Sequence, residues 1–188
     1  MSPESIISIF LGIGLAAAVG FRIFIPLFVL SLATHFGHIP VNESFAWVGS
    51  TSTLIVLAVA TIVELTAYFI PFVDNLLDTV AVPLAAIAGT LVMAAVLIDM
   101  PEVMTWSLAI IAGGGTAAAI SGTTATTRAA SSATTLGFAN PIVAVAETGG
   151  ALSISILSIV FPVLAMVLVV IVLFIMYRIL KRIFKPKK

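Results

Sequence analysis

Long apolar runs separated by short polar turns cover almost the whole chain. The first run, over residues 4–36, would be about 50 Å long as a continuous helix, which is too long for one upright membrane crossing. Within it, Gly20 and Pro26 flank Arg22; glycine adds backbone freedom and proline removes a backbone hydrogen bond. The pattern therefore predicts a first crossing that is broken or kinked near Arg22.

Five more helices are predicted after the polar loop over residues 37–47. Each is bounded by proline or by polar residues. The second helix is expected over residues 50–70, the third from residue 74 or 75 to residue 98, and the fourth over residues 103–135. The fifth is expected from residue 140 to the turn at Pro162, and the sixth from Pro162 to the basic tail. The fourth of the six contains a segment rich in Gly, Ala, Ser and Thr. Small residues allow helices to approach closely in a membrane, and hydroxyl groups can bond across helices.

The composition supports this pattern. Apolar residues make up 61% of 188 positions, charged residues 9%, and the mean hydropathy is +1.29. Soluble domains are about 45–50% apolar and about 25% charged. We therefore expect an all-α fold: a polytopic transmembrane helical bundle of about six helices with broken or kinked segments, forming a single domain over residues 1–188.

The basic residues predict an orientation. Six of the eight lie in the tail over residues 178–188, and this tail is expected in the cytoplasm by the positive-inside rule. Six crossings would place the amino terminus there as well. The tail follows an apolar run directly, so it is interpreted as a topology anchor and no nucleic-acid partner is expected. The start of the chain lacks a positive signal-peptide region, so the first run is expected to be retained.

Two halves of opposite orientation, residues 4–98 and 103–184, would form a 3+3 inverted repeat of the kind found in secondary transporters. The sequence trace of such a repeat is short. Gly14-Leu-Ala-Ala-Ala with Arg22 downstream matches Gly115-Thr-Ala-Ala-Ala with Arg128 downstream. Alanine-rich helices also produce such matches by chance.

Four acidic residues fall within apolar segments: Glu64, Asp74, Asp78 and Glu147. A charge at membrane depth costs a few kcal/mol on insertion scales, so it is usually paired, directed to a wet cavity or functional. Glu64 precedes Pro71 by seven residues and Glu147 follows Pro141 by six, which places them at similar depth. Asp74 and Asp78 are four residues apart and share a helix face.

Two interpretations of these acids stay open. They could form a proton-coupled or cation-binding site that, with Arg22 and Arg128, also holds an anionic group. Alternatively, Glu64, Asp78 or Glu147 could pair with the arginines and lock the bundle, while Asp74 caps the third helix. Two arginines cannot neutralise four acids, which favours a functional role for Glu64 and Asp78.

Several chemistries are not expected. The chain has no cysteine, so disulfides and thiolate chemistry are excluded. His35 and His38 have no acidic partner nearer than Glu43, and no histidine lies at membrane depth to activate a serine or threonine. We therefore expect no enzyme activity, no cofactor and no metal site.

The order of these residues resembles a known family. Glu64, Pro71, Asp74 and Asp78 are followed by a glycine in the next helix, a Gly/Ala-rich segment ending in Arg128, and Asn140 before Glu147. This order resembles the small bacterial membrane proteins of domain of unknown function 4126, from about residue 12 to residue 162. The resemblance implies a bacterial inner membrane protein and no known activity. Tyr68-Phe69 and Thr148 stand where members of that family often carry additional charges.

The sequence therefore predicts a small transporter or translocase. Its expected partners are the lipid bilayer, an unknown small ion or anionic substrate, and further copies of itself, because six helices barely enclose a pathway. The alternative is a non-transporting membrane scaffold whose buried ion pairs are structural.

Overall fold

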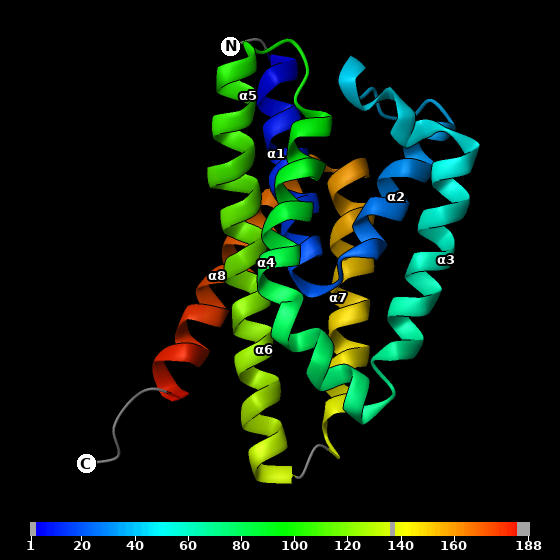
Figure 1. Cartoon of the computed structure of the whole chain (residues 1–188). Coiled ribbons are helices and arrows are strands. Elements are labelled where there is room, and N and C mark those ends of the chain that lie inside the picture. The colour runs from blue at the N-terminus through cyan, green and yellow to red at the C-terminus, as the bar shows by residue number, and fades with distance from the viewer. Residues whose placement is uncertain (1–2, 136–137, 184–188) are drawn as a thin grey trace.

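Prolines and polar turns set most of the helix ends in the computed structural model. The structure describes residues 3–135 and 138–183, without the side chains of residues 71, 72, 74, 75, 182 and 183. The helices are α1 (Pro3–Phe21), α2 (Phe24–His35), the 3-10 helix η1 (Glu43–Gly49), α3 (Thr51–Ala67), α4 (Pro71–Val96), α5 (Glu102–Leu108), the π-helical segment η2 (Ala109–Gly114), α6 (Gly115–Thr135), α7 (Asn140–Val160) and α8 (Pro162–Ile183). The described part of the chain is an all-α bundle, as the sequence predicts (Figure 1).

The helices are long and apolar enough for a membrane protein. Among the described residues, five helical segments could cross a bilayer by length and composition, or six if the bent pair of η1 and α3 counts as one span. Helices α5, η2 and α6 form one of these segments, over Glu102–Thr135, as expected for the predicted fourth helix. The all-α bundle of about six membrane-length helices is therefore confirmed.

The first apolar run breaks where the sequence predicts, at Arg22, but it then turns back. Ile9 near the start of α1 packs against a buried cluster that contains Met93 and Ala94, near the end of α4. Asn42, which follows α2, donates its backbone N–H to Ala95 of α4. The start of α1 and the end of α2 therefore lie at the same end of the bundle, with the break deep inside it (Figure 1).

This reversal changes the expected relation of the two termini. Helix α8 runs beside α1 in the same direction, because Ala165 lies near Gly14 while Val169 packs with Ala17 and Ala18. The described N-terminal end thus lies at the α4–α5 end of the bundle, and α8 ends at the opposite end (Figure 1). Both termini were expected on one side because the first run was counted as a single crossing.

Close helix packing explains the glycines of the fourth predicted helix. A Cβ atom on Gly113 of η2 would lie 2.7 Å from the carbonyl oxygen of Gly89 on α4 and 2.7 Å from the Cβ of Met93. Neither atom belongs to a flexible side-chain end, so the two backbones could not remain this close. The small residues here thus set the distance between α4 and the α5–α6 segment.

Replacing Gly113 by Ala should therefore lower the free energy of unfolding by about 1–3 kcal/mol, the usual cost of overpacking. Gly115→Ala is the matched control, because a Cβ at Gly115 would meet no described atom within 4 Å apart from its chain neighbours and its own helix backbone. Helix propensity should make that control neutral or slightly stabilising. Thermal unfolding in detergent micelles measures both. Equal destabilisation by the two changes would contradict the packing argument.

Candidate functional site

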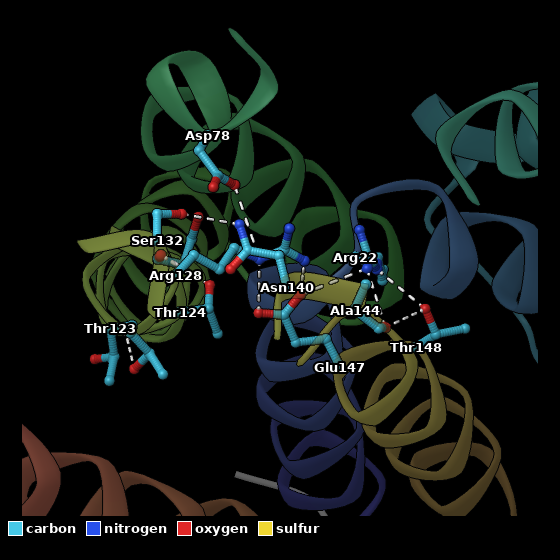
Figure 2. Close-up of polar contacts among 12 residues, drawn as sticks. Arg22, Asp78, Thr123, Thr124, Arg128, Ser132, Asn140, Ala144, Glu147 and Thr148 are labelled. Carbon is cyan, nitrogen blue, oxygen red and sulfur yellow. Dashed lines mark hydrogen bonds and ion pairs between the residues drawn. The ribbon is translucent and has the colours of Figure 1, made fainter. Parts of the chain in front are cut away.

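Two arginines and a glutamate form a buried ion-pair cluster inside the bundle. Arg22 lies at the α1–α2 break, Arg128 on α6 and Glu147 on α7, and their exposed fractions are 2%, 2% and 5%. Arg128 donates from Nε to Glu147 Oε1 at 3.1 Å and from Nη2 to Glu147 Oε2. Arg22 Nη2 lies 3.5 Å from the same Oε2 (Figure 2). One carboxylate is thus shared by both guanidinium groups.

Arg22 is also held by α7 itself. Its Nε donates to the hydroxyl of Thr148 at 3.2 Å, and its Nη2 donates to the carbonyl of Ala144 at 3.0 Å (Figure 2). Arg22 follows the last residue of α1, so these bonds fix the break in the first apolar run against α7. The remaining nitrogen, Nη1, is buried and has no hydrogen-bond partner among the described residues.

Glu64 stabilises the other side of the break. Its Oε1 accepts the backbone N–H of Ile23 at 2.8 Å, and its Oε2 accepts the N–H of Phe24 at 3.0 Å. The first N–H groups of a helix have no partner within the helix, and a negative charge is favourable at that end. The cap residue of α2, Ile23, offers no side-chain acceptor. The Glu64 carboxylate, on the neighbouring helix α3, therefore accepts these N–H groups.

Tyr68 lies between the two arginines and was not among the predicted site residues. Its ring centre is 3.7 Å from the Cζ atom of Arg22 and 4.4 Å from that of Arg128. A guanidinium over an aromatic face gains cation–π attraction, which is stronger away from water. The sequence signal that could have identified Tyr68 is its spacing from Glu64: it follows Glu64 by four residues and therefore shares its helix face. Thr148, the hydroxyl partner of Arg22, was also missed.

Asp78 completes the cluster from α4. One of its carboxylate oxygens lies 4.0 Å from Arg128 Nε, and its side chain is 20% exposed, far more than the side chain of Arg128. Asp78, Glu64 and Glu147 all line a small cavity of about 10 Å³, near the lower limit for one water molecule. Polar residues of α6, among them Ser121 and Thr124, complete its wall.

The structure thus brings together five of the six predicted site residues: Arg22, Glu64, Asp78, Arg128 and Glu147. Asp74 is the exception, because its side chain lies outside the described residues. Helix α4 begins at Pro71 with Ile70 as its cap residue, so Asp74 lies in the first turn and does not occupy the predicted cap position. Arg128 lies within α6, inside the helix predicted over residues 103–135.

The charges of this cluster are unequal. Three carboxylates face two guanidinium groups, and one carboxylate, Glu64, bonds backbone N–H groups of α2. Such a cluster can exchange a proton with little rearrangement, or hold an additional cation or oxyanion.

Comparison with known proteins identifies a family. The sequence family described as Domain of unknown function (DUF4126) matches residues 9–182, nearly the whole chain. The protein belongs to this family. No curated protein and no solved structure matches the chain. In this DUF4126 protein, the matched region contains every residue of the cluster, from Arg22 to Glu147.

Proposed function

We propose that this DUF4126 protein is a small transporter or translocase of the bacterial inner membrane, in which the carboxylates carry a proton or cation. One observation supports this proposal most: ionisable side chains from four helices and a helix break meet at a buried cavity. Charged groups at membrane depth are costly and typically mark ion or substrate pathways. Helices broken at such a site are also typical of transporters.

The basic end of α8 supports a defined orientation for the proposed transporter. Arg178 and Lys181 lie in its last turns, and more basic residues follow in the sequence. The positive-inside rule places this end in the cytoplasm. The α3–α4 turn and the cluster side of the bundle would then face the cytoplasm, and α1 would begin on the external side.

A non-transporting scaffold is the second candidate, and the cluster itself gives the reason. Glu147 is already bonded to two arginines, and Glu64 caps α2, so each carboxylate has a structural task. Buried ion pairs of this kind can hold helices in register without any transport. The two candidates make different predictions for Asp78, which is the most exposed acid of the cluster.

Asp78→Asn should reduce proton flux by about an order of magnitude or more, since it removes the most exposed of the three carboxylates that line the cavity. The free energy of unfolding should change by only about 1 kcal/mol, because the pair with Arg128 is long and partly exposed. Liposomes containing the purified protein and a pH-sensitive dye measure the flux under a pH gradient.

Glu102→Gln is the control for this experiment, because Glu102 lies exposed at the start of α5, away from the cluster. Proton flux that is no faster than in protein-free liposomes, or that is unchanged in Asp78→Asn, would contradict the proposed proton transport. A variant that loses assembly instead of flux would support the scaffold.

A further inference from the structure

An apolar groove opens on the side of the bundle between α3 and α4. Helix α3 packs mainly against α2 and η1, so its other side diverges from α4 after the short turn that joins them. The groove has a volume of about 630 Å³ and is lined by residues of α2, α3 and α4, including Leu27, Val56, Val59, Val80, Leu84 and Leu91. Apart from Glu64 and Tyr68, its lining is apolar, as is typical of a surface that contacts lipid.

The groove is polar at one end only. Glu64 and Tyr68, near the end of α3, belong to its lining, and they lie at the α3–α4 turn. From there the lining extends along α4 from Leu77 to Leu91, about 21 Å at 1.5 Å per residue. Half of a hydrocarbon core is about 15 Å, so the groove can hold a lipid tail from one leaflet. The polar end lies on the side of the α3–α4 turn, and the apolar path leads away from that turn, which matches the direction of a lipid in the adjoining leaflet.

The polar end of the groove adjoins the ion-pair cluster. Glu64 and Tyr68 line both the groove and the small polar cavity, so they form the wall between the two. The guanidinium of Arg22 stacks on the Tyr68 ring, 3.7 Å from its centre. Within the cluster the unused hydrogen-bonding capacity is a donor, because Arg22 Nη1 is buried without a partner among the described residues.

Two acids of the cluster, Glu64 and Glu147, are occupied, by contrast. Both oxygens of Glu64 accept backbone N–H groups, and both oxygens of Glu147 accept from Arg128. Figure 2 shows one nitrogen of Arg22 on the side away from Glu147 and Thr148, with no bond drawn to it. The group that complements this nitrogen is an acceptor, such as a phosphate oxygen, which a guanidinium binds well.

We propose that the groove binds one anionic phospholipid, with an acyl chain between α3 and α4 and its phosphate directed to Arg22 past the Tyr68 ring. This inference rests on the proposed function, for which it names a lipid as the substrate class. Binding is nevertheless measurable without transport. The proposal needs the ring of Tyr68 to move aside, because that ring covers the guanidinium in the present structure.

The experiment measures the phosphatidylglycerol that stays bound to the purified protein in native mass spectra after detergent washing. A Val59→Trp/Val80→Trp variant places a large ring on each wall of the groove. Ile55→Trp is the matched control, because Ile55 and Val59 are similarly exposed, at 59% and 55%, on the same helix, and Ile55 does not line the groove. Arg22→Lys keeps the charge and removes the planar fork. Inorganic phosphate serves as a second probe.

Wild type and Ile55→Trp should retain one phosphatidylglycerol, whereas the groove variant and Arg22→Lys should bind it at least roughly ten-fold more weakly. Inorganic phosphate alone should not displace the lipid. Equal retention by the groove variant and its control, or complete displacement by phosphate, would overturn the proposal. Lipid binding without proton flux would contradict the proposed transport only, and flux that persists in the groove variant without lipid binding would contradict the lipid proposal only.

Discussion

Replacing Arg128 by Met should destabilise the protein by about 3–5 kcal/mol, the typical cost of removing one partner from a buried ion pair. The change leaves the carboxylate of Glu147, which is 5% exposed, with only the longer contact to Arg22. It also leaves Asp78 without the charge that lies 4.0 Å away. Thermal or detergent-induced unfolding in micelles measures the loss.

Removing both partners should cost less than removing one. In Arg128→Met/Glu147→Leu the buried carboxylate that faced Arg128 is removed as well, and an apolar pair of similar volume is often neutral in such a place. Arg22 loses its 3.5 Å contact with Glu147 and keeps its bonds to Thr148 and Ala144. Lys181→Met is the control for loss of a positive charge, because Lys181 is exposed on α8. A double variant as unstable as the single one would show that the pair is not the source of the effect.

These two variants also bear on the choice between transporter and scaffold. A folded double variant that has lost proton flux supports a functional role for the pair. A folded double variant with unchanged flux would show that Arg128 and Glu147 are not part of the proposed proton path. Buried ion pairs are weak evidence for stability on their own, so the scaffold candidate depends on the double variant losing assembly.

The helices were predictable from the sequence because their ends carry strong local signals. Asn140 with Pro141, and Pro162, open helices where the sequence places them, and the acidic turn before Glu102 separates α4 from α5. Proline at the first helical position fits because its missing N–H needs no partner there. The α3–α4 turn was misplaced, since α3 ends at Ala67 and not at residue 70, and α4 begins at Pro71 although Asp74 was expected to be its cap.

The direction of the chain after the break was not predictable. Gly20 and Pro26 indicate that the helix is interrupted, but both a kink and a reversal satisfy that signal. The reversal depends on contacts with residues far along the chain: Arg22 with Thr148 and Ala144 of α7, and Ile23 and Phe24 with Glu64 of α3. Local sequence patterns do not contain these contacts.

The members of the candidate site were predictable, but their tasks were not. Charged residues are rare in this chain, so Arg22, Glu64, Asp78, Arg128 and Glu147 stood out by type alone. Depth estimates also placed Glu64 and Glu147 at one level. Tyr68 did not stand out, because tyrosine is ordinary in membrane helices and its role depends on two arginines that other helices bring to it.

Glu64→Ala should release the start of α2, because two partly buried N–H groups, those of Ile23 and Phe24, lose their acceptor. Leaving a buried donor unsatisfied costs about 1–3 kcal/mol for each group, so this is among the largest effects expected of a single substitution here. Glu64→Gln should fall between Ala and wild type, since one amide oxygen replaces two carboxylate oxygens and the N-terminal charge interaction is lost.

Hydrogen exchange followed by mass spectrometry reports this change locally. The amides at the start of α2 should exchange faster than wild type in Glu64→Ala, and the increase in exchange rate should be smaller in Glu64→Gln. Thr66→Val is the control and should leave the exchange rate unchanged, because it alters only an exposed hydroxyl that bonds within α3. Amides that stay protected in Glu64→Ala would show that the carboxylate does not stabilise the break. In that case its burial beside Arg22 would have no structural explanation, and a direct role in carrying charge would become the stronger interpretation.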